Sequence, residues 1–180
     1  APITIKEGTT VRKLSKRKDK EAAISFYQKL GIPTEVIRLY LATIENYDFE
    51  EWYNANPDKG IDDFTFEFRK MPIGGTLFDM EKLQSISKIY FSHLKNYELY
   101  DMTLDYTKEY DEEFYNILVN NKEYALNVFN IERDIERPRK DIASLSDVKT
   151  EFSYMFNDLF YKDTNPYAEC KVCAKNIVLD

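Results

Sequence analysis

The sequence predicts an all-α protein, a helical bundle of two small subdomains, and two observations support this prediction. Only 5 Gly and 6 Pro interrupt 180 residues, too few turn residues for a sandwich or barrel of many short strands. Apolar residues recur at helical spacing in several segments. No apolar run approaches the roughly 18 residues that cross a bilayer, so we expect no membrane partner. The length fits one domain or two small ones.

The first segments combine a short alternating stretch with a helix. Ile3 and Ile5 alternate with polar residues, which predicts a brief strand whose partner the sequence does not reveal. Asp19 is a candidate N-cap of the next helix, with Glu21 in a first turn where the helix dipole favours an acid. Gly31 is the natural residue to end this helix. Its apolar face comprises Ala23, Phe26, Tyr27 and Leu30.

The second helix is expected to begin at Pro33, whose missing N–H would be unpaired at a first helical position anyway. Its apolar stripe is Ile37, Tyr40, Leu41 and Ile44. Asp48 is then expected to cap a shorter helix that carries Phe49 and Trp52. A turn follows at 56–60.

The middle of the chain is less regular. Asp62 or Asp63 can start a short helical piece, and the alternating Phe residues that follow leave a strand open as the alternative. These residues are Phe64, Phe66 and Phe68. Residues 71–76 form the most irregular segment and the candidate boundary between the two subdomains.

The second half is predicted to be helical throughout. Asp79 is expected to cap a long helix, and further helices are predicted at about 97–109, 112–120 and 122–132. The apolar face of the long helix is Leu83, Ile86, Tyr90 and Leu94. The last strong helix starts near Ser144 or Ser146 and is expected to bury Val148, Phe152, Met155, Phe156 and Leu159. Several Tyr are expected in the core or at its edge rather than as a base-stacking platform: Tyr90, Tyr97, Tyr100, Tyr106 and Tyr110. Residues 163–180 end in an apolar stretch, so we expect the chain to stop within an element.

Charge is distributed unevenly along the chain. The formal net charge is −7, yet residues 12–20 hold six bases against one acid. Residues 96–114 hold seven acids against Lys108, and residues 132–141 are dense in both signs. A phosphate ligand responds to charge within about 10 Å at ordinary salt, so a basic face can bind nucleic acid despite the negative total. The simpler interpretation of any such run is a solvated helix face.

The Cys and His content indicates neither a disulfide framework nor a metal site. Two Cys in a chain of this length favour a reducing cytoplasm. Cys170 and Cys173 form only half of a tetrahedral zinc site, and the only His, His93, lies far away in the sequence. We therefore expect no bound metal, and His93 is expected to interact with the last carbonyls of its helix.

One segment is specific enough to indicate chemistry: Lys13-Leu14-Ser15-Lys16-Arg17. It resembles the signature loop of class I aminoacyl-tRNA synthetases, in the form typical of glutamyl-tRNA synthetases. Two further segments follow in the family's order, a helix–Gly31-Ile32-Pro33–helix element and the run Phe78-Asp79-Met80-Glu81-Lys82-Leu83. The family usually continues with Trp and Asn before a Tyr. Here Ser85 and Ser87 stand in those places before the expected Tyr90.

The resemblance implies roles for the loop. Lys16 would be the principal lysine that stabilises the transition state of adenylate formation, and Lys13 would support it. Leu14, Ser15 and Arg17 would contact ATP, which the intact enzyme uses with Mg²⁺. The family's catalytic domain precedes this loop and carries a His-x-Gly-His-like motif, which a chain with His93 alone does not contain. We therefore expect the chain alone to be inactive and to bind no cofactor.

The same resemblance divides the chain into three parts. Residues 1–18 would be a basic arm with the signature loop, 19–72 a helical stem-contact subdomain, and 73–180 a truncated helical anticodon-binding subdomain. The expected partners are tRNA(Glu) and the N-terminal catalytic domain of the same protein, in a cytoplasmic monomer. The expected tRNA contacts are Arg12, Lys18, Arg133, Arg137, Arg139, Lys140 and Lys149. Pro138 would keep Arg137 extended and exposed.

Two alternatives stay open. Acids interleaved with the bases of 132–141 make self-paired surface ion pairs as plausible there as RNA contacts. The whole chain could also be a helical protein–protein interaction module without RNA binding, its basic N-terminus being a disordered arm. Glutaminyl-tRNA synthetase shares a similar loop, but its β-barrel anticodon region does not fit the helical pattern downstream.

Overall fold

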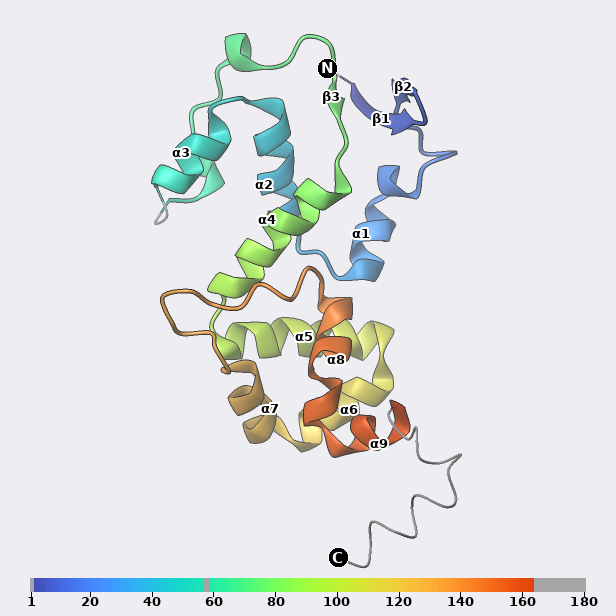
Figure 1. Ribbon diagram of the computed structural model, residues 1–180, viewed down its shortest axis with the longest axis vertical. Helices are drawn as coiled ribbons and strands as arrows, with labels where there is room; N and C mark the ends of the chain where they lie inside the picture. The colour runs from blue at the N-terminus through green and yellow to red at the C-terminus, as the bar shows by residue number, and fades with distance from the viewer. Residues whose placement is uncertain (1, 57–58, 164–180) are drawn as a thin grey trace, which may run out of the picture.

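The computed structural model describes residues 2–56 and 59–163, with side chains up to residue 160. Helices dominate this elongated molecule, which confirms the mostly helical fold class. Figure 1 shows a hairpin and the first four helices at one end, and the remaining helices at the other. The helices are α1 (Ile24–Leu30), α2 (Thr34–Glu45), α3 (Phe49–Ala55), α4 (Met80–His93), α5 (Asn96–Tyr110), α6 (Glu112–Asn120), α7 (Lys122–Phe129), α8 (Leu145–Phe152) and α9 (Asn157–Asp163). Short 3₁₀ turns are η1 (Lys20–Ala22), η2 (Ile61–Asp63), η3 (Phe68–Lys70) and η4 (Ser153–Met155).

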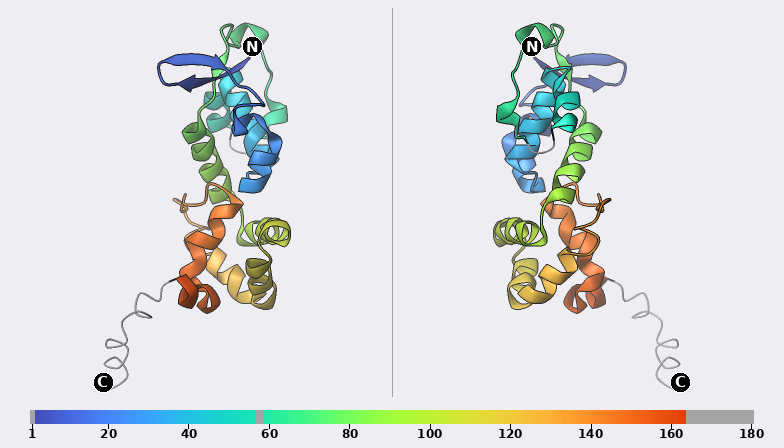
Figure 2. Two further views of the ribbon diagram at one scale, coloured as in Figure 1. Left: turned by 90° about the vertical axis from the view of Figure 1, so that its right-hand side faces the viewer. Right: turned by 90° about the vertical axis from the view of Figure 1, so that its left-hand side faces the viewer.

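A small sheet lies at the N-terminal end of the molecule (Figure 1). Strands β1 (Ile3–Glu7) and β2 (Thr10–Lys13) form an antiparallel hairpin, and β3 (Thr76–Leu77) pairs in parallel with β1, giving the order β2-β1-β3. The predicted strand around Ile3 therefore has partners on both sides. The second partner has only two residues and lies some 70 residues downstream, so no periodicity could indicate it. Figure 2 shows the hairpin projecting from the helical body.

The helix after the hairpin begins later than predicted, at Ile24. Asp19 does not cap it, because the Asp19 carboxylate is engaged by Arg12 instead. The end of the helix is as predicted: Gly31 adopts a left-handed φ of 68°, and its N–H bonds to the carbonyl of Gln28. Of the expected apolar face, Tyr27 is buried and the others are partly buried.

Helix α2 is covered on two sides, which changes the predicted stripe. Pro33 is its N-cap with extended ψ of 145°, so the helix begins one residue later than expected. The fully buried residues are Val36, Leu39, Tyr40 and Ala42. Val36 and Tyr40 pack with Leu83 of α4, whereas Leu39 and Ala42 pack with Phe49 of α3. The predicted stripe assumed that α2 buries only one face. Leu41, which belongs to that stripe, is 37% exposed.

From residue 59 to β3 the chain is irregular apart from two 3₁₀ turns, η2, which holds Asp62 and Asp63, and η3, which begins at Phe68. Phe64 and Phe66 lie between these turns, in neither a helix nor a strand. Phe64 and Phe66 instead pack on Phe49, with ring centroids 5.1 and 6.2 Å away. Asp48 lies at the N-cap of α3 without a side-chain cap bond, since its carboxylate pairs with Lys70. Tertiary ion pairing thus replaces the predicted capping role.

Helix α4 begins as predicted, because the Asp79 carboxylate accepts a hydrogen bond from the Lys82 N–H at 3.1 Å. Its residues contribute to the cores of both ends of the molecule. Tyr90 packs against all three apolar clusters, and Ser87 Oγ donates to the Ala143 carbonyl at 2.6 Å. The cores therefore meet along α4 rather than at residues 71–76. The functional division into 19–72 and 73–180 stays a prediction.

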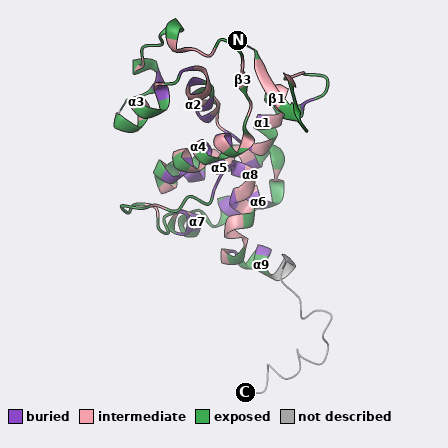
Figure 3. Cartoon of the chain, turned by 45° about the horizontal axis from the view of Figure 1, so that its top comes forward, coloured by how far each residue is buried: buried purple, intermediate pink, exposed green. Residues whose placement is uncertain are grey.

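The second core lies among α5, α6, α7, α8 and α9, where Figure 3 shows the buried residues on the inner helix faces. Helices α5 and α6 match the predicted ranges closely, and α7 ends at Phe129, three residues earlier than predicted. The predicted last helix is divided by η4 into α8 and α9, with Val148, Phe156 and Leu159 buried. Of the Tyr series, Tyr100 is buried and Tyr97 is 56% exposed.

Candidate functional site

The basic segment of residues 13–19 forms a closed turn between the hairpin and η1. Lys13 ends β2, and the Leu14 N–H continues the hairpin by donating to the Ile3 carbonyl at 2.9 Å. The Ser15 carbonyl then accepts from the N–H groups of Lys18 (3.0 Å) and Asp19 (2.9 Å). These bonds give the segment a defined backbone shape.

The Asp19 carboxylate lies at the centre of this turn. Its two oxygens accept from Nη1 and Nη2 of Arg12, both at 2.7 Å, and Oδ2 also accepts from the Ser15 N–H at 2.7 Å. The Arg12 guanidinium, and then the Ser15 amide, lower the pKa of Asp19 to about 2. Arg12 Nε also donates to the Glu7 carboxylate at 2.5 Å, so all three nitrogens of its guanidinium group are hydrogen-bonded. Sequence reasoning assigned Arg12 to RNA contact, whereas the structure uses it inside the turn.

Lys13 and Lys16 lie together at a groove of about 320 Å³ between this turn and the helices. Leu14 shares the lining, and the rest is largely apolar, with Tyr40, Phe78 and Leu83 among the residues beneath. Neither lysine side chain forms an ion pair or hydrogen bond with any residue in the described part of the chain. The structure therefore brings together three of the five predicted loop residues. Ser15 and Arg17 do not line the groove.

The predicted contact Arg133 has a structural role. Its guanidinium donates to the carbonyls of Phe91 (2.5 Å), Leu94 (3.0 Å) and Phe129 (2.8 Å), at the ends of α4 and α7. Burial lowers its pKa, because the charged form is partly desolvated. The assignment of Arg133 to the RNA-contacting set stays a prediction, and these bonds to backbone carbonyls do not favour it.

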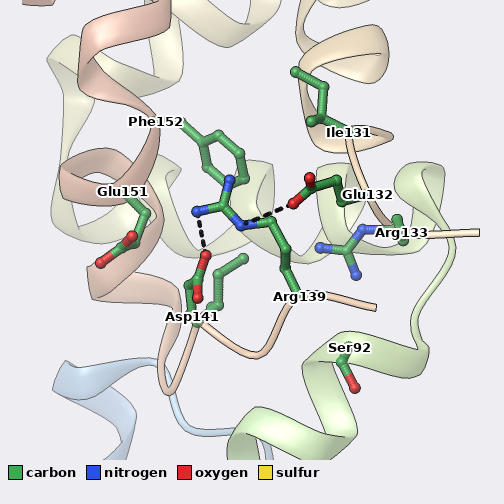
Figure 4. Close-up of a pocket in the computed structure, with 9 residues that line it drawn as sticks. Ser92, Ile131, Glu132, Arg133, Arg139, Asp141, Glu151 and Phe152 are labelled. Atoms are coloured by element: carbon green, nitrogen blue, oxygen red, sulfur yellow. Dashed lines mark ion pairs between the residues drawn. The ribbon is translucent and has the colours of Figure 1, made fainter. Parts of the chain in front are cut away.

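The other predicted contacts divide into paired and unpaired bases. Arg139 lies between Glu132 (3.6 Å) and Asp141, and Figure 4 shows both ion pairs as dashed lines. Lys149 of α8 pairs with Asp111 at 2.9 Å and Glu113 at 3.0 Å. Arg139 thus pairs with acids of its own 132–141 run, as the alternative of self-paired charges expects, whereas Lys149 pairs with acids far from it in the sequence. Their assignment as RNA contacts stays a prediction. Three of these other predicted contacts form no ion pair within the described ranges 2–56 and 59–163, and all three are exposed: Lys18, Arg137 and Lys140.

Sequence reasoning missed the acids that organise these bases. Asp19 was interpreted as a helix cap, and Asp111 and Glu113 only as part of an acidic run. The alternation of signs at 132–141 did indicate that Glu132 and Asp141 could pair locally. No comparable signal links Lys149 to acids 36 and 38 residues earlier in the chain.

In the described ranges, no group of three or more His, Cys, Asp or Glu is arranged to hold a metal ion. Cys170 and Cys173 lie outside those ranges. His93 is the last residue of α4 and is exposed. None of the helices within the described ranges has the length and apolar character needed to cross a membrane.

Comparison with curated proteins finds similarity to aminoacyl-tRNA synthetases, the class that the basic loop on a helical body indicates. The matched proteins are glutamate–tRNA ligases, and the chain is similar to their C-terminal part. The chain spans only about 29% of the length of the curated relatives it matches.

Three relatives illustrate the similarity. The chain is 40% identical over 158 residues to the glutamate–tRNA ligase of Clostridium perfringens (strain 13 / Type A), a match that covers 88% of this chain and 29% of that protein. It is 39% identical over 169 residues to the ligase of Acetivibrio thermocellus, covering 91% of this chain and 31% of the relative. For the ligase of Sorangium cellulosum the identity is 36% over 149 residues, with 83% and 26% covered. No protein-family model matches the sequence, and no solved structure matches it significantly.

Proposed function

We propose that this chain supplies the ATP-closing loop and part of the tRNA-contacting surface of a glutamate–tRNA ligase, which uses ATP to attach glutamate to its tRNA. One observation carries the proposal: Lys13 and Lys16, without acidic partners among the described residues, share one groove beside a structured turn. The similarity to glutamate–tRNA ligases over 88% of the chain favours this function over a protein–protein interaction module.

The lysines can act on the nucleotide electrostatically. In adenylate formation, negative charge develops on the α-phosphate and on the departing pyrophosphate, and a positioned ammonium group stabilises it. We assign this role to Lys16, with Lys13 supporting it. Leu14 and Arg17 would contact ATP beside them. The Ser15 N–H is already bonded to Asp19, so Ser15 would contact ATP through its hydroxyl.

The groove that holds Lys13 and Lys16 does not fit the requirements of a Mg²⁺ site. Mg²⁺ prefers several oxygen ligands in an octahedral arrangement. The groove offers one carboxylate, that of Glu21. We therefore propose that Mg²⁺ reaches the site with the ATP phosphates and is held by residues outside this groove.

The RNA-contacting surface is smaller than the sequence predicted. We retain Lys18, Arg137 and Lys140 as phosphate contacts, which position an RNA without reading its bases. Arg139 and Lys149 are secondary contacts, because exposed ion pairs contribute only about 0–1 kcal/mol and can exchange an acid for a phosphate. The proposed partners are tRNA(Glu) and the catalytic domain of the same protein, acting as a cytoplasmic monomer.

Adenylate formation in the full-length ligase tests the role of Lys16. We expect Lys16→Ala to lower the rate of ATP–pyrophosphate exchange by about 10²–10³-fold, with little change in tRNA affinity. Lys6→Ala is the matched control, because Lys6 is an exposed lysine of the same hairpin outside the groove. Exchange that is equally fast in the Lys16 variant and the control would refute the proposed role.

Binding of tRNA to this chain tests the surface. Affinity should fall steeply between about 50 and 200 mM salt, because phosphate contacts release counterions. Arg137→Ala and Lys140→Ala should each reduce the slope of log K against log salt by about 0.7–0.9. Absent binding, or binding insensitive to salt, would favour the interaction-module alternative.

A further inference from the structure

One ion pair in the described part of the chain differs from the others in burial. The Asp19 side chain is 6% exposed, whereas the acids of the other pairs are between 28% and 84% exposed. A buried carboxylate persists only where charged and hydrogen-bonding partners compensate its desolvation. Asp19 has three such bonds, each 2.7 Å long, from the Arg12 fork and the Ser15 N–H.

The three bonded residues bracket the two groove lysines. Arg12 immediately precedes Lys13, Ser15 immediately precedes Lys16, and Asp19 closes the segment. The carboxylate therefore fixes the backbone before each lysine, while the lysine side chains stay exposed and unpaired within the described chain. An ion pair that merely joined the hairpin to η1 would not need the amide of Ser15.

We propose that Asp19 and Arg12 form a clasp that positions Lys13 and Lys16 at their shared groove. Neither residue lines the groove, so both are positioning residues that act through the lysines. The inference rests on the function proposed above for Lys13 and Lys16. It also assigns Arg12 to the interior of the loop and excludes it from RNA contact.

The loop itself provides the first test, in the 180-residue chain. Trypsin cleaves after Lys16, Arg17 and Lys18 only when the turn opens. Breaking hydrogen bonds to a charged group changes such an opening equilibrium by about tenfold or more, so Asp19→Ala should accelerate cleavage by that factor. Glu7→Gln is the matched control. Glu7 binds Arg12 but is 64% exposed, and its side chain forms no hydrogen bond or ion pair with the described residues 13–19, so cleavage should stay within about twofold of wild type.

A conservative series makes the loop test independent of folding. Asp19→Asn keeps an oxygen for the Ser15 N–H but loses the charge, and Arg12→Lys keeps the charge but loses the two-pronged fork. Both should give intermediate cleavage rates with unchanged helical circular dichroism. Cleavage in Asp19→Ala as slow as in Glu7→Gln would overturn the clasp.

Kinetics in the full-length ligase provide the second test. Displacing a reacting group by about 1 Å can cost 10²-fold in rate, so Asp19→Ala should lower kcat for ATP–pyrophosphate exchange by about 10- to 100-fold. The KM for tRNA should not change. Because Asp19 acts through Lys16, the double variant with Lys16→Ala should be no slower than Lys16→Ala alone.

The outcomes separate this inference from the proposed function. If Lys16→Ala leaves exchange unchanged, the function assigned to the lysines fails, and the clasp loses its role with it. If Lys16→Ala slows exchange but Asp19→Ala does not, only the clasp fails. Multiplicative losses in the double variant would likewise show that Asp19 acts independently of Lys16 and would overturn the clasp alone.

Discussion

Gly31 joins the two ends of the molecule, and its replacement by Ala is predicted to be strongly destabilising. Its carbonyl accepts from the Leu145 N–H at 3.1 Å, and the neighbouring Lys29 carbonyl accepts from Tyr106 Oη at 2.7 Å. A Cβ on Gly31 would lie 2.6 Å from Leu145 Cβ and 2.9 Å from two Tyr106 ring carbons. Helices α5 and α8 would therefore have to move away from the end of α1.

The magnitude has two parts. A left-handed φ of 68° costs a residue with a Cβ about 1–2 kcal/mol. Overpacking against atoms that cannot rotate away costs about 1–3 kcal/mol more. We expect Gly31→Ala to reduce the free energy of unfolding by about 2–5 kcal/mol, a large fraction of the roughly 5–15 kcal/mol of an ordinary domain.

Urea unfolding measures this loss, followed by far-ultraviolet circular dichroism and by fluorescence of the single Trp, Trp52. Gly8→Ala is the matched control, because Gly8 has a φ of 62° but no atom within 4 Å of an added Cβ. The control should lose only the backbone cost of about 1–2 kcal/mol. Equal losses in the two variants would refute the close-approach argument.

Two further predictions concern the charged residues. Arg133→Ala should reduce the free energy of unfolding by about 2–4 kcal/mol, because three backbone carbonyls lose a charged donor. The exposed Arg137→Ala should change it by less than about 0.5 kcal/mol in the same urea titration, and equal effects would contradict the structural role of Arg133. The pKa of Asp19 is lowered, so its stabilising contribution is present above the ordinary pKa near 4 and is lost as pH falls toward 2. The amide resonance of Ser15, measured by NMR against pH, should therefore shift with a midpoint near 2, and a midpoint near 4 would show that Asp19 lacks its partners.

Local signals in the sequence predicted the features that depend on neighbouring residues. Gly31 ends its helix because only a left-handed residue fits there, and Asp79 begins one because its own backbone neighbour supplies the donor. Asp19 and Asp48 have the same capping chemistry, yet their carboxylates bind Arg12 and Lys70 instead. Propensity describes what a residue can do locally and does not include competing partners that the fold brings near.

The candidate site was predictable to a similar degree. The motif located Lys13 and Lys16, but no sequence pattern indicated that Asp19 after them would close the loop. Basic residues in a run look equivalent, and only the folded chain distinguishes the buried Arg133 from the exposed Arg137. Periodicity likewise could not predict the two-residue strand β3, because β3 pairs with β1, which lies some 70 residues earlier in the sequence.

Helix α4 shares its side chains with three apolar clusters, and Tyr90 contributes to each of them. Rotating one end of the molecule against the other would expose buried apolar surface to water, and each Å² exposed would cost about 25 cal/mol of free energy. The fourteen residues of α4 thus act as a rigid spacer of about 21 Å, at 1.5 Å per residue. A long ligand that touches both the hairpin end and the 130–143 segment would meet two surfaces joined through α4, so its dimensions would matter without any contact to a base.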